Sequence, residues 1–187
     1  MRILKVFPGM REFDMVKELY IASFPESFRI PVWRMALLSM LRPSVELLAY
    51  FDGDLFCGFT FTICTRRHLY INFFAVVPEL RSHGYGGRIG AMLMERYPRP
   101  MIGMVKMPVE GTEDYEEDMR RVRFWEAHGT DFYGYQHVFT DANGVKFLAG
   151  ATGTEYDRDA YQEIFDKRSL GFASVMRLIF HKPYQKD

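Results

Sequence analysis

A glycine-rich turn between an apolar segment and a helical one constrains the fold of this chain most. Residues 69–77 (LYINFFAVV) form a long, mostly apolar run, which predicts a strand covered on both faces. Pro78 follows the run, and glycines at positions 84, 86, 87 and 90 open a predicted helix over 84–96. A helix that starts at glycines leaves its first backbone N–H groups accessible and carries partial positive charge there. The turn therefore predicts an anion site, for which phosphate is the usual ligand.

Two familiar phosphate-binding motifs do not fit this turn. A P-loop requires a Lys directly after its last glycine, and no Lys follows these glycines. The dinucleotide fingerprint requires glycine at the first, third and sixth positions, and the sixth position counted from Gly84 is Ile89. Both motifs are excluded. Arg81, His83 and Arg88 nevertheless add side-chain donors around the turn.

The rest of the sequence alternates between helical and extended patterns. Apolar residues at helical spacing predict helices, and apolar runs bounded by turn residues predict strands. The segments Asp52-Gly53-Asp54 and Asp141-Ala142-Asn143-Gly144 predict hairpin turns. The predicted helices cover residues 12–23, 32–41, 84–96, 114–128 and 158–168, and the predicted strands cover 2–7, 46–50, 55–65, 69–77, 101–107, 131–140 and 145–151. Residues 24–30 form an irregular loop, and residues 173–180 have no firm assignment. These elements predict a mixed α/β domain.

Charge and composition exclude several classes of function. The chain has 24 basic and 24 acidic side chains and a formal net charge of zero, which argues against nucleic acid as the main partner. No segment approaches the ~20 apolar residues of a membrane-spanning helix, and the first residues lack the apolar core of a signal peptide. Cys57 and Cys64 are an odd number of positions apart on one predicted strand, so they lie on opposite faces and form no local disulfide. A reducing cytoplasm is the expected setting.

The spacing within the glycine turn carries a family resemblance. Arg81 to Gly86 (RSHGYG) contains Arg-x-x-Gly-x-Gly, and Ala75 to Glu79 (AVVPE) ends the strand before it. Downstream, Arg123 to Gly129 (RFWEAHG) places an aromatic pair near a helix end, followed by glycine. These segments resemble the two signatures of the GNAT superfamily of N-acetyltransferases. The order of predicted elements is similar to that family from residue 2 to about residue 150.

The resemblance implies a fold, an activity and partners. The implied fold class is α/β (α+β), a mixed, mostly antiparallel sheet with a splayed central strand and helices on both faces. An acetyltransferase domain would cover residues 1–152, with a C-terminal extension, residues 153–187, packed on the same domain. The activity would be transfer of an acetyl group from acetyl-CoA to an amine by direct attack. The acceptor would be a small molecule or a protein amine. The protein itself would be a monomer or a homodimer, with no nucleic acid or membrane as partner. No His-Glu-x-x-His motif or Cys/His cluster predicts a metal.

The resemblance also implies which residues bind the cofactor. Backbone groups of Phe74, Ala75 and Val76 would bond the pantetheine arm and the acetyl carbonyl, and the Val76 amide would stabilise the developing oxyanion. Amides of residues 82–87 would hold the diphosphate, and the acceptor would enter between the loop 24–30 and the last hairpin. The expected cofactor-binding residues are Phe74, Ala75, Val76, Arg81, Ser82, His83, Gly84, Tyr85, Gly86, Gly87, Arg88 and Trp125.

The groups that handle protons depart from the family pattern. Some family members carry a carboxylate on the central strand, whereas residues 68–72 contain no Asp or Glu. Many members have Tyr where this chain has Trp125, and Asn where it has Asp118. The catalytic candidates are therefore Tyr70, Asn72 and Tyr135, with Tyr133 and His137 as further side chains of suitable chemical type.

Three hypotheses about function stay open from the sequence. The first is an acyl-CoA-dependent N-acyltransferase, which the intact phosphate turn favours. The second is a catalytically silent CoA-binding or interaction module, which the missing carboxylate and Tyr favour. The third is an enzyme whose acceptor lies on another protein, such as an N-terminal amine. The acidic run 110–118 is expected to be a solvated loop and helix start, where carboxylates suit the helix dipole.

Overall fold

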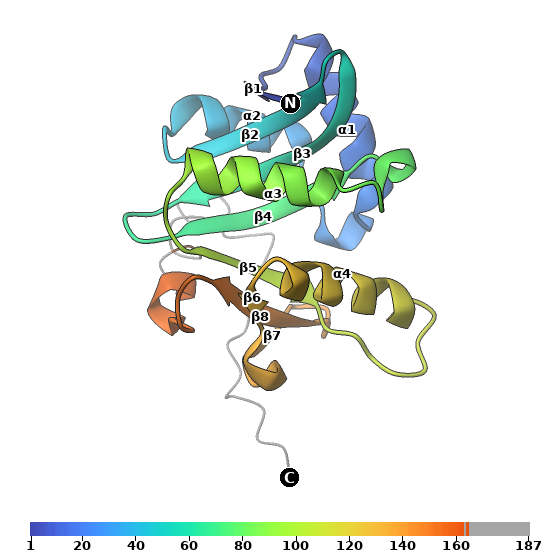
Figure 1. The fold of residues 1–187 in the computed structure, drawn as a ribbon, viewed down its shortest axis with the longest axis vertical. Helices are drawn as coiled ribbons and strands as arrows, with labels where there is room; N and C mark the ends of the chain where they lie inside the picture. Colours follow the sequence, from blue (N-terminus) through green and yellow to red (C-terminus); the bar gives the residue numbers. More distant parts are fainter. Residues whose placement is uncertain (163, 165–187) are drawn as a thin grey trace. The chain divides into compact units, whose positions relative to one another are not determined.

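A computed structural model describes residues 1–162 and residue 164, which belong to two compact units (Figure 1). The first unit is Met1–Pro98 and the second is Arg99–Asp187. The predicted domain limit at residue 152 stays a prediction, and the unassigned segment 173–180 lies outside the described residues. Within the described part of the chain, no helix has the length and apolar character needed to cross a membrane.

The sheet of the first unit has four strands, all paired antiparallel in the order β1-β2-β3-β4. Almost every side chain of β3 is buried, as expected for a strand covered on both faces. The predicted hairpin turn at Asp52-Gly53-Asp54 joins β2 to β3, and Gly53 takes the left-handed φ of 59° that such turns require. The four strands are β1 (Arg2–Lys5), β2 (Val45–Asp52), β3 (Leu55–Cys64) and β4 (Leu69–Val76).

Helices cover both faces of this four-stranded sheet (Figure 1). On one face, the ring of Tyr20 packs edge-on against Phe73 at 5.0 Å between centroids. On the opposite face, Arg96 reaches Glu46 of β2 with two hydrogen bonds of 3.0 Å. The first face carries α1 (Arg11–Ser23), the short 3-10 helix η1 (Glu26–Phe28) and α2 (Val32–Leu41), and the second carries α3 (Tyr85–Arg96). The predicted helix over 32–41 has the observed limits.

Two β-bulges interrupt the alternation of side chains in this sheet. The register between β2 and β3 shifts at Cys57, and the register between β3 and β4 shifts at Asn72. A bulge sets two residues of one strand opposite a single residue of its partner. The faces occupied before and after each bulge therefore differ from those that a period of two predicts. No disulfide joins Cys57 to Cys64.

The second unit is built around strand β8. This strand pairs antiparallel with β5, and also with the short strands β6 and β7. Helix α4 packs on the unit through Val122, which forms a buried cluster with Phe132 and Leu148. The elements are β5 (Met101–Lys106), α4 (Tyr115–Ala127), β6 (Thr130–Asp131), β7 (Val138–Thr140) and β8 (Lys146–Thr152). Residues 158–162 and 164 are helical, in agreement with the predicted helix as far as it is described.

The predicted strand over residues 131–140 is wrong. It is two short strands, β6 and β7, separated by the 3-10 turn η3 (Tyr133–Tyr135). Tyr133, Gly134 and Tyr135 have φ angles of 53°, 61° and 64°, whereas an extended strand requires negative φ. The carboxylate of Asp131 accepts a hydrogen bond from Tyr133 N at 2.6 Å, so a local side chain competes with strand pairing.

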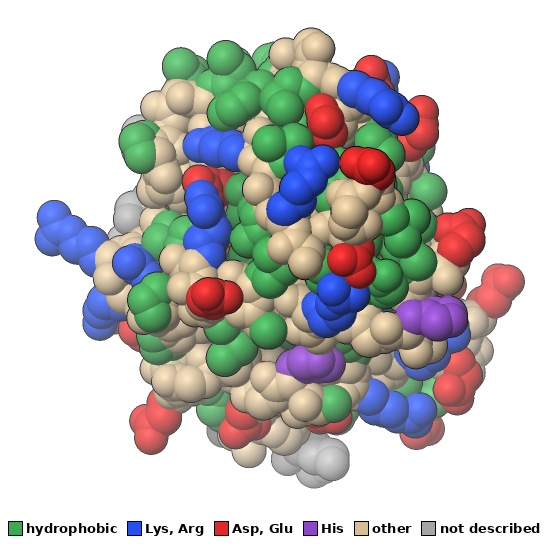
Figure 2. Space-filling view, turned by 45° about the horizontal axis from the view of Figure 1, so that its top comes forward, with side chains coloured by type: hydrophobic (Ala, Val, Ile, Leu, Met, Phe, Trp, Pro, Cys, Tyr) green, Lys and Arg blue, Asp and Glu red, His purple; other side chains and the backbone are tan. Residues whose placement is uncertain are grey.

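Charged side chains of both signs are interspersed on the face of the molecule shown in Figure 2. Basic and acidic groups do not separate into large fields of one sign there. This distribution agrees with the net charge of zero.

Candidate functional site

The end of β4 lies tightly against β3. The backbone N–H of Val77 donates to Cys57 O at 3.0 Å, which extends the contact beyond the last residue of β4. A Cβ atom on Gly58 would lie 2.3 Å from Ala75 O and 3.2 Å from Cδ1 of Ile89 in α3. Only glycine fits at this position, and its absent side chain lets α3 lie close to the sheet where β4 ends.

The chain then enters α3 through two residues with left-handed backbone. After the 3-10 turn η2 (Pro78–Leu80), Ser82 has a φ of 63° and Gly84 a φ of 79°. Gly84 is the N-cap of α3, so the helix begins at Tyr85, one residue after the predicted start, and apart from its chain neighbours no atom lies within 4 Å of where its Cβ would be. The left-handed conformation costs a non-glycine residue such as Ser82 roughly 1–2 kcal/mol. Such strain is often found where a backbone is shaped for a ligand.

The start of α3 presents backbone donors without intrahelical acceptors. The N–H of Arg88 donates to Gly84 O at 3.1 Å and makes the first hydrogen bond of the helix. The N–H groups of Tyr85, Gly86 and Gly87 precede it, so no carbonyl of the helix is available to them. These donors and the positive end of the helix dipole suit an anion. The geometry thus fits the predicted anion site.

Two side chains of the turn bond its own backbone. Arg81 Nε donates to Val76 O at 3.3 Å, and His83 Nδ1 lies 2.7 Å from Arg81 O. Because a carbonyl oxygen can only accept, Nδ1 is the protonated ring nitrogen of His83. Both side chains are exposed. They therefore stabilise the turn while remaining at its surface.

Arg88 is paired with an acidic residue of β2. Its Nη1 atom lies 2.8 Å from Oδ2 of Asp52, and the Tyr85 hydroxyl donates to the same oxygen at 3.3 Å. The guanidinium group also lies over the Tyr85 ring, 5.0 Å from its centroid. The hydrogen bond between Arg88 and Asp52 is the main cause that lowers the pKa of Asp52 and raises the pKa of Arg88. Sequence reasoning missed Asp52, because 36 positions separate it from Arg88.

The bulge at Asn72 changes the face on which Tyr70 lies. Tyr70 pairs with Ile63 of β3, and Phe73 pairs with Phe61. The two β3 residues are two positions apart and share a face, so Tyr70 and Phe73 share a face as well. The ring of Phe73 packs on α1. Tyr70 therefore lies on the face of the sheet that α1 covers.

This placement separates Tyr70 from the end of β4. An uninterrupted alternation would put Tyr70 on the same face as Phe74 and Val76. In the structure, Val76 lies opposite Gly58 on the face that contacts α3, so Tyr70 and Val76 are on opposite faces of the sheet. Tyr70 is only 2% exposed, and Asn72 is half-buried at the bulge itself. Of the two candidates on β4, Asn72 is the more accessible.

Solved structures resemble this arrangement, although no protein-family model and no curated protein sequence matches the chain. A GNAT-family protein from Bacteroides thetaiotaomicron matches with a TM-score of 0.75 and 22% identity, over 92% of this chain and 98% of its own. An aminoglycoside 6'-N-acetyltransferase complexed with coenzyme A matches with a TM-score of 0.61 and 17% identity, over 84% of this chain and 100% of its own. Ard1 from Thermoplasma volcanium matches with a TM-score of 0.58 and 16% identity, over 80% and 95%.

The chain has the GNAT fold. This likeness confirms the predicted fold class and the family resemblance of the architecture. At sequence identities of 22% and below, the likeness shows the fold and does not identify the acceptor.

The second signature of the GNAT fold lies at the end of α4 in this chain. Trp125 packs against the buried cluster of Val122, Phe132 and Leu148. The ring of Phe124 contacts the Trp125 ring edge-on at 5.1 Å. The indole therefore contributes to the core of the second unit, and its contact with a cofactor stays a prediction.

The aromatic candidates around η3 form a stacked group. The Tyr133 hydroxyl donates to Thr154 O at 2.9 Å, and the His137 ring lies flat on Tyr156 at 3.5 Å between centroids. Burial lowers the pKa of His137, which favours the neutral imidazole. Tyr135 is 37% exposed, and its pKa is raised, first by burial and then by Glu126 and Tyr115. Tyr135 thus keeps its proton at neutral pH.

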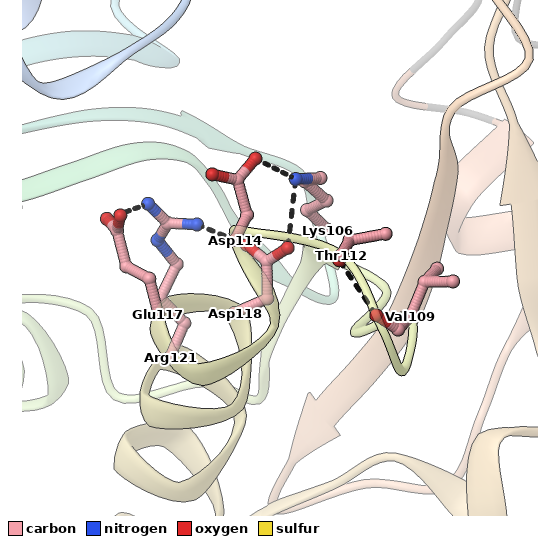
Figure 3. A network of polar contacts seen from close by, with 7 residues as sticks. All are labelled: Lys106, Val109, Thr112, Asp114, Glu117, Asp118 and Arg121. Carbon is pink, nitrogen blue, oxygen red and sulfur yellow. Dashed lines mark hydrogen bonds and ion pairs between the residues drawn. The ribbon is translucent and has the colours of Figure 1, made fainter.

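A network of ion pairs, which the sequence does not predict, joins β5 to the first turns of α4 (Figure 3). Lys106 Nζ lies 2.8 Å from Asp114 and 2.9 Å from Asp118, and Arg121 pairs with Asp118 and Glu117. Burial acts to lower the pKa of Lys106, but the hydrogen bonds to the two aspartates outweigh it and the pKa is raised. Asp118, which stands where the family often has Asn, therefore has a structural partner in Lys106.

Proposed function

We propose that this chain is an acetyl-CoA-dependent N-acetyltransferase that transfers an acetyl group to an amine by direct attack. The observation that carries this proposal is the open helix start of α3, entered through left-handed Ser82 and Gly84, in a chain with the GNAT fold. Two structural neighbours, the aminoglycoside acetyltransferase and the NatC complex, are described with CoA bound. Among the described residues, no group of three or more His, Cys, Asp or Glu side chains could hold a metal ion.

The residues of the first unit fit the chemical groups of acetyl-CoA. Amides from Ser82 to Gly87 would hold the diphosphate, with help from the side chains of Arg81, His83 and Arg88. Backbone groups of residues 74–76 would bond the pantetheine arm. The Cβ-free Gly58 supports this role, because it fixes β3 against the end of β4. The contact of Trp125 with the cofactor is implied by the family resemblance and stays a prediction.

The chemical step requires an unprotonated amine. An alkylamine has a pKa near 10.4, so the neutral form at pH 7 costs about 4–5 kcal/mol. The amine nitrogen would attack the thioester carbonyl carbon while the Val76 amide stabilises the oxyanion. The carbon–sulfur bond then breaks, and the thiolate takes up the proton that the amine releases.

The protonation states of the candidates suggest different roles in that transfer. Tyr135 keeps its proton and is therefore a candidate proton donor. His137, whose pKa is lowered, is by the same reasoning a candidate proton acceptor. Asn72, which is half-buried at the bulge, is assigned to positioning a water or the acceptor, whereas Tyr70 is only 2% exposed on the face that α1 covers and stays a candidate by chemical type.

The alternative is a catalytically silent CoA-binding module with the same fold. Two observations favour it: β4 carries no carboxylate, and Trp125 stands in place of a tyrosine and packs in the second unit. An acceptor on another protein, such as an N-terminal amine, is a further form of the first proposal. The neutral charge balance supports a protein or small-molecule acceptor rather than a nucleic acid.

Thiol release from acetyl-CoA tests the activity. The purified protein is assayed against a panel of polyamines, aminoglycosides and peptides with free N-termini, beside CoA titration by calorimetry. Turnover of any acceptor supports the enzyme. CoA binding without turnover supports the silent module.

The variant Gly86→Glu tests the site, because it places a carboxylate among the backbone N–H donors at the start of α3. Acidic residues suit the first turn of a helix, so this variant should fold while losing CoA binding. An unchanged affinity for CoA in a folded Gly86→Glu protein would contradict the assigned site.

A further inference from the structure

Two arginines tie α3 to β2, one at each end of the helix. Arg96 binds Glu46 near the C-terminal end, and Arg88 binds Asp52 near the N-terminal end. Helix positions 88 and 96 are separated by about 12 Å along the axis. The two pairs have the same chemistry, and only the second lies beside the proposed phosphate turn.

The two pairs differ in geometry. Arg96 makes two bonds of 3.0 Å to Glu46, in a fork that also suits the negative end of the helix. Arg88 makes one bond of 2.8 Å to Asp52, and the two side chains are 47% and 34% exposed. An exposed pair with one hydrogen bond is weak in water. The Arg88–Asp52 pair can therefore be exchanged for a stronger anion, whereas Arg96 is held by its two bonds to Glu46 and by a further bond of 3.2 Å from Nε to the Tyr97 hydroxyl.

Asp52 already binds two hydrogen-bond donors that an incoming anion would use. It accepts hydrogen bonds from Arg88 and from the Tyr85 hydroxyl, both in the first turns of α3. Helical side chains lean toward the N-terminal end of their helix, which brings the Arg88 guanidinium toward the open amides. The carboxylate therefore lies beside the helix start as an internal anion.

We propose that Asp52 limits the affinity of this site for CoA, because its carboxylate holds Arg88 and places a negative charge beside the diphosphate. This inference rests on the proposed function. Asp52 is a residue that sets affinity, and it takes no part in acetyl transfer. An enzyme that must release CoA after each turnover benefits from such a limit.

Four variants test this role by calorimetric titration with CoA at low salt. Asp52→Asn should lower the Kd for CoA about two- to fivefold, the range expected for one exposed charge pair. Arg88→Gln removes the closest cation of the carboxylate and leaves it beside the N-terminal ammonium group of Met1, 3.9 Å from Oδ1, so it should raise the Kd by a similar factor. The double variant should return close to the wild-type Kd, because the local charge is again balanced. Glu46→Gln is the matched control at the far end of α3, and it should leave the Kd unchanged.

Two further measurements show that the effect is electrostatic and acts on the diphosphate. The gain from Asp52→Asn should shrink in 0.5 M salt, where charges are screened within about 4 Å or less. The gain from Asp52→Asn should disappear when pantetheine, which lacks the diphosphate, is titrated in place of CoA. Thermal unfolding of each variant establishes that it is folded.

The outcomes separate this inference from the proposed function. If Asp52→Asn weakens CoA binding as much as Arg88→Gln does, Asp52 positions the helix and the inference is overturned. An unchanged Kd in both variants overturns it as well, while leaving the proposed function intact. A wild-type protein that does not bind CoA at all overturns both.

Discussion

The Nζ atom of Lys106 lies 2.9 Å from Oδ2 of Asp118, whose side chain is 1% exposed on the first turns of α4. A buried carboxylate is stable only if it is paired. Lys106 comes from the end of β5, so this pair fixes the helix start to the strand. Arg121 supplies a second cation to the same carboxylate from one turn further along α4.

Replacing Lys106 should therefore destabilise the protein. Lys106→Met leaves Asp118 with Arg121 alone, and we expect a loss of about 1–3 kcal/mol in the free energy of unfolding. Urea denaturation measures the loss, and Lys17→Met, at an exposed position of α1, is the control. Adding Asp118→Asn to Lys106→Met should restore part of the stability. A double variant that is less stable than Lys106→Met would contradict the account.

The same pair predicts an alkaline limit. The folded pKa of Lys106 is raised above its ordinary value of 10.5, so its contribution to stability is complete below that pH. The contribution is lost as the pH rises through the folded pKa. The difference in unfolding free energy between wild type and Lys106→Met should thus be constant from pH 7 to about 9.5 and shrink above about 10.5. A constant difference across the whole range would show that the lysine stabilises through packing.

Two glycines of the first unit should respond to alanine in opposite directions. Gly58→Ala drives a Cβ to 2.3 Å from Ala75 O, so the strands must separate, and we expect a loss of about 1–3 kcal/mol. Gly90→Ala lies in the middle of α3 with no atom within 4 Å of the new Cβ, and it should gain about 0.5–1 kcal/mol. Thermal and urea unfolding of the two variants decide this, and equal effects would refute the close approach at Gly58.

The left-handed backbone at Tyr135 predicts a difference between two truncations. Tyr135→Gly and Tyr135→Ala remove the same exposed ring, but only glycine adopts a φ of 64° without strain. The glycine variant should be more stable than the alanine variant by roughly 1 kcal/mol. The comparison needs only unfolding curves of the two proteins. An alanine variant of equal stability would mean that residue 135 relaxes to negative φ.

His137 should contribute to the acid sensitivity of the fold. Burial lowers its folded pKa below the ordinary value of 6.5, so the unfolded chain binds its proton more readily. The contribution of neutral His137 to stability is therefore complete above pH 6.5 and is lost as the pH falls below that value. His137→Phe keeps a ring to stack on Tyr156, and its unfolding free energy should fall less steeply between pH 6.5 and 5. Parallel slopes for the two proteins would exclude this contribution.

The amino-acid sequence by itself determined the features that depend on neighbouring residues. The apolar spacing of residues 32–41 and the prolines beside them set the limits of α2. The glycines after Pro78 placed the helix start at Gly84, because glycine at a left-handed position is a local requirement. Together with the second signature, this turn was sufficient to predict the GNAT fold.

Tertiary structure alone decided the features that depend on pairing between distant segments. The bulge at Asn72 arises from the register of β4 on β3, and it moved Tyr70 to the face that α1 covers. Asp52 meets Arg88 across 36 positions because β2 and α3 pack together. A period of two or 3.6 residues describes one element at a time, so it contains no information on register or on which charges from different elements come into contact.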